Sequence, residues 1–180
     1  MYISQVILTV HDSYEQHQAI WSLFAHVPDR RRDHLFRVEE SDSKVCKVLL
    51  QSSTKPIRSA EASVLATRKF SPTVLEGGYY KFKILAYPTK RCSDTKKIIE
   101  IKGADETVQW LQRKLAGANV NVTSLDTVMV RNKQSHNSRF ICFEGILQVV
   151  SAEAIERVLV MGVGRKKHAG AGLLSLARTQ

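Results

Sequence analysis

The first half of the chain predicts strands and helices in the order β-α-β-β-α-β. The expected elements are a strand at residues 2–10, a helix at 14–24, strands at 35–39 and 45–50, a short alanine- and serine-rich helix at 56–66, and a strand at 79–87. Asp12 or Ser13 can cap the first helix, because a short polar side chain there accepts hydrogen bonds from the free N–H groups of the first turn. This order of elements is that of the ferredoxin-like fold.

The same order of elements returns in the second half. It predicts a strand at 97–101, a helix at 104–115, long β-rich segments at 120–130 and 139–150, a helix at 151–160 and a strand at 173–177. Residues 88–95 are polar and indicate the crossover between the halves. The repetition is one of element order, without a visible sequence repeat. We therefore expect an α+β protein of two tandem ferredoxin-like domains, residues 1–88 and 89–180.

The charge of the chain favours a polyanionic partner. Its 180 residues include 27 Lys+Arg and 17 Asp+Glu, for a formal charge of +10 and a pI of about 9.7. Residues 1–88 hold 12 basic and 9 acidic side chains, whereas residues 89–180 hold 15 and 8, so the second half carries +7 of this charge. A balance of this kind points to nucleic acid first and to an acidic membrane second.

Other features exclude several classes of protein. No apolar run approaches the length of a membrane span, and residues 1–12 lack the pattern of a signal peptide, so we expect a cytoplasmic protein with no membrane partner. Cys46, Cys92 and Cys142 are widely spaced and odd in number, which predicts free thiols. The six histidines form no HExxH motif and the acidic residues form no cluster, so neither a metal nor another cofactor is expected.

A glycine-framed basic loop lies near the C-terminus, at residues 161–176. Its glycines are Gly162, Gly164, Gly170 and Gly172, and they enclose the cationic run Arg165, Lys166, Lys167 and His168. The loop matches neither the dinucleotide fingerprint nor a P-loop, because a lysine stands where the last glycine is needed and no Gly-Lys-Ser/Thr occurs. Two interpretations remain open: a loop that holds phosphate with its amides and cations, or a solvated turn.

Tyr14 and His17 form a candidate acid–base pair on the first helix. Residues three apart on a helix project side by side, and an imidazole with a pKa of about 6.5 exchanges protons near neutral pH. A neighbouring phenol can orient or share that transfer. The alternative is a structural histidine, because His17 falls in the same arc as the apolar Ile20 and Phe24.

Motifs along nearly the whole chain resemble the CasE family, the CRISPR RNA-processing endoribonucleases of type I-E systems. The matching segments are MYISQVIL at 1–8, YEQHQAIWSLF at 14–24, the region from Pro28-Asp29 to Leu35-Phe36-Arg37, LLQS at 49–52, PTK at 88–90, WLQRKL at 110–115, CFEG at 142–145 and GVGRKKHAGAGLLSLA at 162–177. They occur in the order that the family has. The resemblance implies two ferredoxin-like domains, in agreement with the element order.

The resemblance also implies an activity. Members cleave a precursor CRISPR RNA at the 3′ base of the repeat stem-loop without a metal, by attack of the upstream 2′-OH, which leaves a 2′,3′-cyclic phosphate and a 5′-OH. The product hairpin stays bound, and the protein becomes part of the Cascade complex, where it docks on a backbone subunit. His17 matches the family's catalytic histidine, Tyr14 the tyrosine before it, and Lys167 a lysine that stabilises transition-state charge. His168 departs from the small hydroxyl residue expected there, and a second proton-transfer role is one interpretation.

Basic residues in several segments are candidates for contacts to the RNA stem. They are Arg30, Arg31, Arg32, Lys90, Arg113, Lys114, Arg131, Lys133, Arg139, Arg165, Lys166 and His168. Two other functions remain open. One is a non-catalytic hairpin-binding subunit of a CRISPR ribonucleoprotein. The other is a single-strand binder of RRM type, for which Tyr79, Tyr80 and Phe82 could supply aromatic rings, although the RNP consensus is absent.

Overall fold

The computed structural model describes residues 1–26, 30–131 and 136–179, which form two compact units. Unit 1 comprises Met1–Ser71, Val130–Ser138 and Lys167–Gly170. Unit 2 comprises Pro72–Met129, Arg139–Lys166 and Ala171–Gln180. The glycine-framed loop is therefore shared, because its central residues pack with unit 1 while its flanks belong to unit 2. Each unit is described below by itself.

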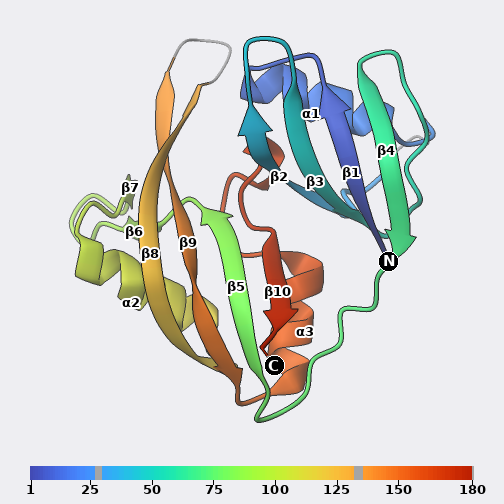
Figure 1. Ribbon diagram of the computed structural model, residues 1–180. Helices are drawn as coiled ribbons and strands as arrows, with labels where there is room; N and C mark the ends of the chain where they lie inside the picture. The colour runs from blue at the N-terminus through green and yellow to red at the C-terminus, as the bar shows by residue number, and fades with distance from the viewer. Residues whose placement is uncertain (27–29, 132–135, 180) are drawn as a thin grey trace. The chain divides into compact units, whose positions relative to one another are not determined.

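Unit 1 contains a four-stranded antiparallel sheet with one helix against it (Figure 1). Its elements are β1 (Tyr2–Leu8), α1 (Ser13–Ser22), β2 (His34–Ser41), β3 (Cys46–Ser52) and β4 (Ala62–Lys69), and the strand order is β2-β3-β1-β4. Alternate residues of the strands, such as Val6 and Phe36, join Ile20 and Leu23 of the helix region in a buried apolar core. This core fixes which side of α1 faces the sheet.

The prediction of a second helix in the first half of the chain is wrong. Residues 53–61 contain no helix, and the chain continues into β4, which pairs with β1 from Tyr2 opposite Lys69 to Leu8 opposite Ala62. Without that pairing one edge of β1 would leave its backbone groups unpaired. The weak helical periodicity of residues 56–66 is therefore overridden by strand pairing, which local propensity does not anticipate.

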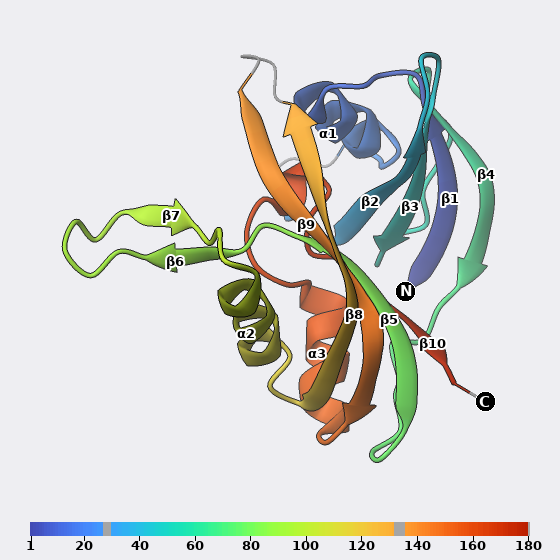
Figure 2. The same ribbon diagram turned by 60° about the vertical axis from the view of Figure 1, so that its left-hand side comes forward.

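Unit 2 contains a second four-stranded sheet with two helices on one face (Figure 2). Its main elements are β5 (Tyr79–Ala86), α2 (Ala104–Lys114), β8 (Ala118–Arg131), β9 (Asn137–Val149), α3 (Ala152–Met161) and β10 (Leu174–Arg178), and the strand order is β10-β5-β9-β8. Trp110 and Leu111 of α2 and Ile155 of α3 share a core with Phe82 and Phe143 of the sheet.

The strand at 79–86 belongs to the second sheet, not to the first as expected. β5 pairs with β9 and β10, and the residues expected to open the second domain instead form a small separate hairpin of β6 (Thr89–Arg91) and β7 (Ile98–Glu100). The compact units therefore differ from the division expected after residue 88. With β5 in first place, unit 2 follows β-α-β-β-α-β, and both sheets have the ferredoxin-like order 4-1-3-2. The fold is α+β with two four-stranded antiparallel sheets, as the sequence predicted.

Helix starts, which depend on neighbouring residues, were predicted better than the pairing of strands. Asp12 caps α1, where its carboxylate accepts hydrogen bonds from the N–H groups of Tyr14 and Glu15 at 2.8 and 2.9 Å. Ser151 caps α3, where its hydroxyl accepts a hydrogen bond from the N–H group of Ala154 at 3.4 Å. Among the described residues, no helix is both long and apolar enough to cross a membrane.

Candidate active site

The capped first helix presents Tyr14 and His17 on neighbouring turns. The Tyr14 side chain is 45% exposed, and its hydroxyl accepts a hydrogen bond from Gln18 at 3.0 Å. His17 is half-buried, because it lies at the border between the exposed face and the face that buries Gln16 and Ile20. Among the residues that the structure describes, its Nδ1 is a buried atom with no hydrogen-bond partner. The imidazole is thus neither a fully packed core group nor a freely solvated one.

The glycine-framed loop brings a short turn of 3-10 helix, η1 (Lys167–Ala169), against α1 and β2 within unit 1. Lys166 and Gly170 on either side of this turn have positive φ values of 57° and 88°. At Gly170 a Cβ atom would approach the ring of Phe36 to 3.2 Å, so glycine serves both the backbone conformation and the close packing. The loop is therefore a built turn that places Lys167 and His168 beside α1.

His17 and His168 meet edge to face. Their ring centroids lie 6.0 Å apart with an interplanar angle of 80°, and His168 is exposed. Partial burial, followed by the charges of Arg32 and His168, holds the pKa of His17 below its usual value. His17 is consequently neutral at pH 7 and able to accept a proton.

A third histidine, His34 on β2, is a feature that the sequence reasoning missed. It is buried between Trp21, at a centroid distance of 5.0 Å, and Phe24, at 5.2 Å, while Trp21 also contacts His17 at 6.1 Å. Burial first, and the charge of Arg32 second, lower the pKa of His34 to about 4, although Asp33 acts in the opposite direction. His34 was missed because a histidine at the start of an apolar strand carries no motif.

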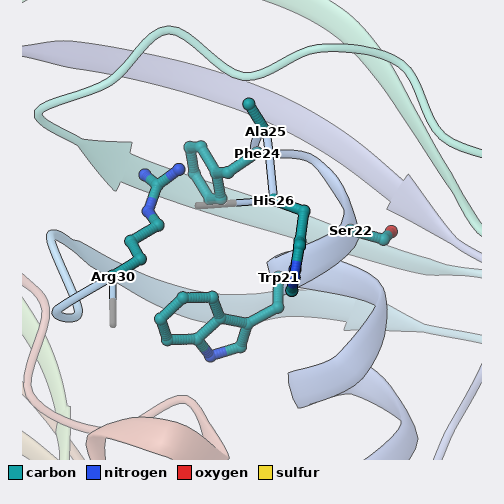
Figure 3. A pocket seen from close by; sticks show the side chains of 6 residues that line it. All are labelled: Trp21, Ser22, Phe24, Ala25, His26 and Arg30. Atoms are coloured by element: carbon teal, nitrogen blue, oxygen red, sulfur yellow. The ribbon is translucent and has the colours of Figure 1, made fainter. Parts of the chain in front are cut away.

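An aromatic pocket of about 380 Å³ lies at the C-terminal end of α1 (Figure 3). Its walls include Trp21, Phe24 and Arg30, and the Arg30 guanidinium lies 4.4 Å from the centre of the Phe24 ring. Arg30 is held there by an ion pair with Asp33 at 2.7 Å. Indole and guanidinium planes of this kind can stack on an unpaired nucleobase.

The structure engages several of the predicted RNA-binding cations in protein contacts. Lys90 pairs with Glu106 at 2.7 Å, and Arg139 donates a hydrogen bond to the carbonyl of Ile101 at 3.1 Å. The Lys166 ammonium lies 4.1 Å from the centre of the Tyr87 ring, and burial lowers its pKa despite the nearby Glu100. These contacts orient the side chains, and Lys166 in particular is a partly desolvated cation.

The remaining predicted cations are exposed and divide between the two units. Exposed in unit 1 are Arg31, Arg32, Arg131 and His168, and exposed in unit 2 are Arg113, Lys114 and Arg165. The predicted catalytic residues Tyr14, His17 and Lys167 all belong to unit 1. Lys133, also predicted to contact RNA, and Pro28-Asp29 of the family motif lie outside the described residues. In the described part of the chain, no three His, Cys, Asp or Glu side chains converge as metal ligands would.

Comparisons with known proteins give one consistent result. A family model described as CRISPR associated protein matches residues 1–178. The CRISPR system Cascade subunit CasE of Escherichia coli K12 is 34% identical over 198 residues, which cover 98% of this chain and 99% of that protein. The CRISPR-associated endoribonuclease Cse3 of Thermus thermophilus is 29% identical over 188 residues, which cover 91% of this chain and 89% of that protein.

Solved structures agree with these relatives. The crystal structure of Cas6e from Escherichia coli K-12 has a TM-score of 0.80 and 32% identity, with 98% of this chain and 99% of that chain covered. A structure of the CRISPR endoribonuclease Cse3 bound to a 19-nucleotide RNA also has a TM-score of 0.80. It is 27% identical, and the match covers 98% of this chain and 100% of that chain. The similarity thus extends over the entire fold.

Proposed function

The chain belongs to the CasE family of CRISPR associated proteins, and we propose that it is the endoribonuclease that processes precursor CRISPR RNA in its own system. The resemblance inferred from the sequence motifs is confirmed by the family model and by the identity to CasE. The substrate is the repeat stem-loop, and the protein acts in the cytoplasm. Cleavage at the 3′ base of the stem leaves a 2′,3′-cyclic phosphate and a 5′-OH.

One observation carries the chemical part of the proposal: the half-buried imidazole of His17 faces the turn that bears Lys167. RNA supplies its own nucleophile, the 2′-OH, so the protein has to align it, move protons and stabilise charge. His17 is neutral at pH 7 and removes the proton from the 2′-OH. Tyr14 orients the reacting ribose, and Lys167 offsets the charge that develops on the phosphate. These side chains can carry out the reaction without a metal ion.

Binding and assembly follow from the distribution of charge. A-form RNA presents its phosphates and its shape more readily than its base edges, and the formal charge of +10 is suited to that surface. The exposed Arg113 and Lys114 at the end of α2 are the leading candidates for stem contacts in unit 2. Since CasE is a Cascade subunit, we propose that this protein keeps its product hairpin and joins the other Cascade subunits, including a backbone subunit.

The deciding experiment compares cleavage and binding of the cognate repeat RNA by wild type, His17→Ala and Glu15→Ala, with a chelator present. General acid–base catalysis contributes roughly 10²–10⁴-fold, so His17→Ala should lose about that much rate while its affinity for the hairpin stays near wild type. Glu15 is an exposed neighbour on α1, so Glu15→Ala should cleave normally.

Two outcomes would overturn parts of this proposal. Unchanged cleavage by His17→Ala would remove the assigned catalytic residue. Tight hairpin binding by a wild-type protein that never cleaves would instead support the alternative, a structural hairpin-binding subunit. The ends of the RNA recovered with the purified protein provide a second readout, because a 2′,3′-cyclic phosphate records the proposed reaction.

A further inference from the structure

His168 occupies a position from which it can reach the same substrate as His17. It is exposed, it belongs to the turn η1 that packs against α1, and its ring lies in edge contact with the ring of His17 at 6.0 Å between centroids. Hydrogen bonds from a catalytic imidazole span about 2.6–3.2 Å. One phosphodiester resting against both rings would therefore lie within reach of a nitrogen from each.

We propose that His168 is the general acid of the cleavage reaction and that it works as a pair with His17. This inference rests on the proposed function, because it assigns a second proton-transfer group to the same site. It gives this chain a two-histidine centre built from α1 and η1, both of which belong to unit 1. The role is catalytic, because the imidazole donates its proton to the leaving oxygen of the substrate.

The step balances with these two groups alone. The 2′-O–H bond breaks and its proton passes to a ring nitrogen of His17, while the 2′-oxygen forms a bond to phosphorus. The bond from phosphorus to the 5′-oxygen then breaks, and that oxygen takes a proton from the His168 imidazolium. The products are the 2′,3′-cyclic phosphate and the 5′-OH, and exchange with solvent restores both histidines.

The neighbouring candidates are less suited to this role. A general acid works best when its pKa lies near the operating pH. Lysine and tyrosine have ordinary pKa values of about 10.4 and about 10, whereas histidine has about 6.5. Lys167 is therefore better used as a fixed positive charge, and Tyr14 as an orienting hydroxyl. Histidine is the residue type on η1 whose ordinary pKa is suited to donating a proton near neutral pH, and His168 is that residue.

Electrostatics around the pair favours one protonated and one neutral ring. The charge on His168 is among the causes that hold the pKa of His17 low, together with burial and Arg32. After burial and Arg32, the charge of His17 is in turn among the causes that lower the pKa of His34 on β2 to about 4, so that ring is neutral at pH 7. Lys167 on the same turn adds a further positive charge near the site. His168 is exposed and His17 is half-buried, and water stabilises a charged imidazolium better at the exposed ring, so we assign the acid to His168 and the base to His17.

The test uses full-length protein in single-turnover cleavage of two repeat RNAs. One has the natural linkage, and the other has a sulfur in place of the 5′-bridging oxygen at the cut site, which makes a leaving group that needs no proton. His168→Gln should slow cleavage of the natural RNA by roughly 10²–10⁴-fold and cleave the sulfur-substituted RNA at nearly the wild-type rate. His17→Gln should be slow on both RNAs, because the base is required in either case.

Control variants separate catalysis from folding. His11→Gln changes another exposed histidine of unit 1, which is bonded to the carbonyl of Asp42, and should leave both rates unchanged. His168→Ser installs a small hydroxyl and should behave like His168→Gln. A normal rate for His168→Gln on the natural RNA, or equal slowing on both RNAs, would overturn the acid role. A wild-type protein that cleaves neither RNA would instead overturn the proposed function itself.

The pH profile supplies an independent readout. Wild-type cleavage of the natural RNA should rise with pH as His17 loses its proton and fall at higher pH as His168 loses its own. His168→Gln should lose the falling limb and keep the rising one. Retention of both limbs in His168→Gln would assign the acid to another group, with Tyr14 the next to examine.

Discussion

The two units share a strand order but divide the titratable residues unequally. All six histidines lie in unit 1, and unit 2 contains none. Basic residues are spread evenly by comparison, because unit 1 holds 13 basic and 8 acidic residues and unit 2 holds 14 and 9, which gives +5 for each. The +7 of residues 89–180 is therefore a property of the linear halves and not of the packed units. The imidazole side chains, whose ordinary pKa lies near neutral pH, are therefore confined to unit 1, whereas both units carry cations that can contact phosphates.

The helices α1 and α2 occupy equivalent places in the two units and differ in the side chains that they bury. Each follows the first strand of its sheet. Helix α2 buries Trp110 and Leu111 in the core of unit 2, whereas α1 also buries the polar Gln16 and keeps His17 half-buried. The large apolar side chains of α2 stabilise unit 2, whereas the position of His17 at the border of the buried face of α1 is suited to hold a reactive group.

The largest effect is expected from the substrate. A repeat RNA with 2′-deoxyribose at the cut nucleotide lacks the nucleophile, so its cleavage should fall to background. Its affinity should remain close to that of the natural RNA, because phosphate contacts are kept. Cleavage assays and equilibrium binding on the same RNA pair measure both quantities. Cutting of the deoxy RNA would show that unit 1 does not act through the 2′-OH.

The next largest effect concerns stability. Trp110→Ala removes a ring that is only 4% exposed and should lower the free energy of unfolding by about 3–5 kcal/mol. Trp21→Ala on α1 should cost less, because Trp21 is half-buried. Chemical denaturation of both variants and wild type measures the difference. Equal losses would contradict the view that α2 is the stabilising helix and α1 the reactive one.

A smaller effect should appear in the pH dependence of stability. The pKa of His34 is about 4 in the fold and about 6.5 when unfolded, so the unfolded chain binds more protons between these values. The contribution is complete above pH 6.5 and is lost as the pH falls towards 4, by about 3 kcal/mol. Denaturation of wild type and His34→Gln between pH 7 and 4 checks this. Parallel profiles for the two proteins would contradict it.

The smallest effect separates binding from chemistry in unit 2. About six phosphate contacts would lower wild-type affinity roughly a thousandfold between 50 and 200 mM salt. Arg113→Gln or Lys114→Gln should each reduce the salt slope by about one, without changing the cleavage rate at saturating RNA. Arg157→Gln on α3 is a matched control, because Arg157 is exposed, is paired with Glu153 and lies outside the proposed surface. A changed rate at saturation would place α2 in the chemistry.

Much of the fold could be predicted because its signals are local. The caps of α1 and α3, the apolar face of α2 and the long strands at 118–131 and 137–149 follow from residues close together in sequence. The two errors, a helix in place of β4 and the placement of β5, both concern which strands pair. Strand pairing is non-local, and a short segment of mixed composition does not encode its partner.

In the candidate site, too, the features set by nearby residues could be predicted and those set by packing could not. Spacing along one helix brought Tyr14 and His17 together, and the glycines marked the loop of Lys167 as unusual. His34 carried no motif, and its burial beside Trp21 depends on how β2 packs under α1.

The sequence by itself determined that the chain is a basic α+β protein of the CasE family, with a histidine on its first helix and a glycine-framed loop near its end. Those features follow from composition, periodicity and the order of the motifs. Only the tertiary structure decided that β5 completes the second sheet and that the loop carries His168 to within 6.0 Å of His17. Contacts between residues separated by most of the chain arise from packing, which no local pattern specifies.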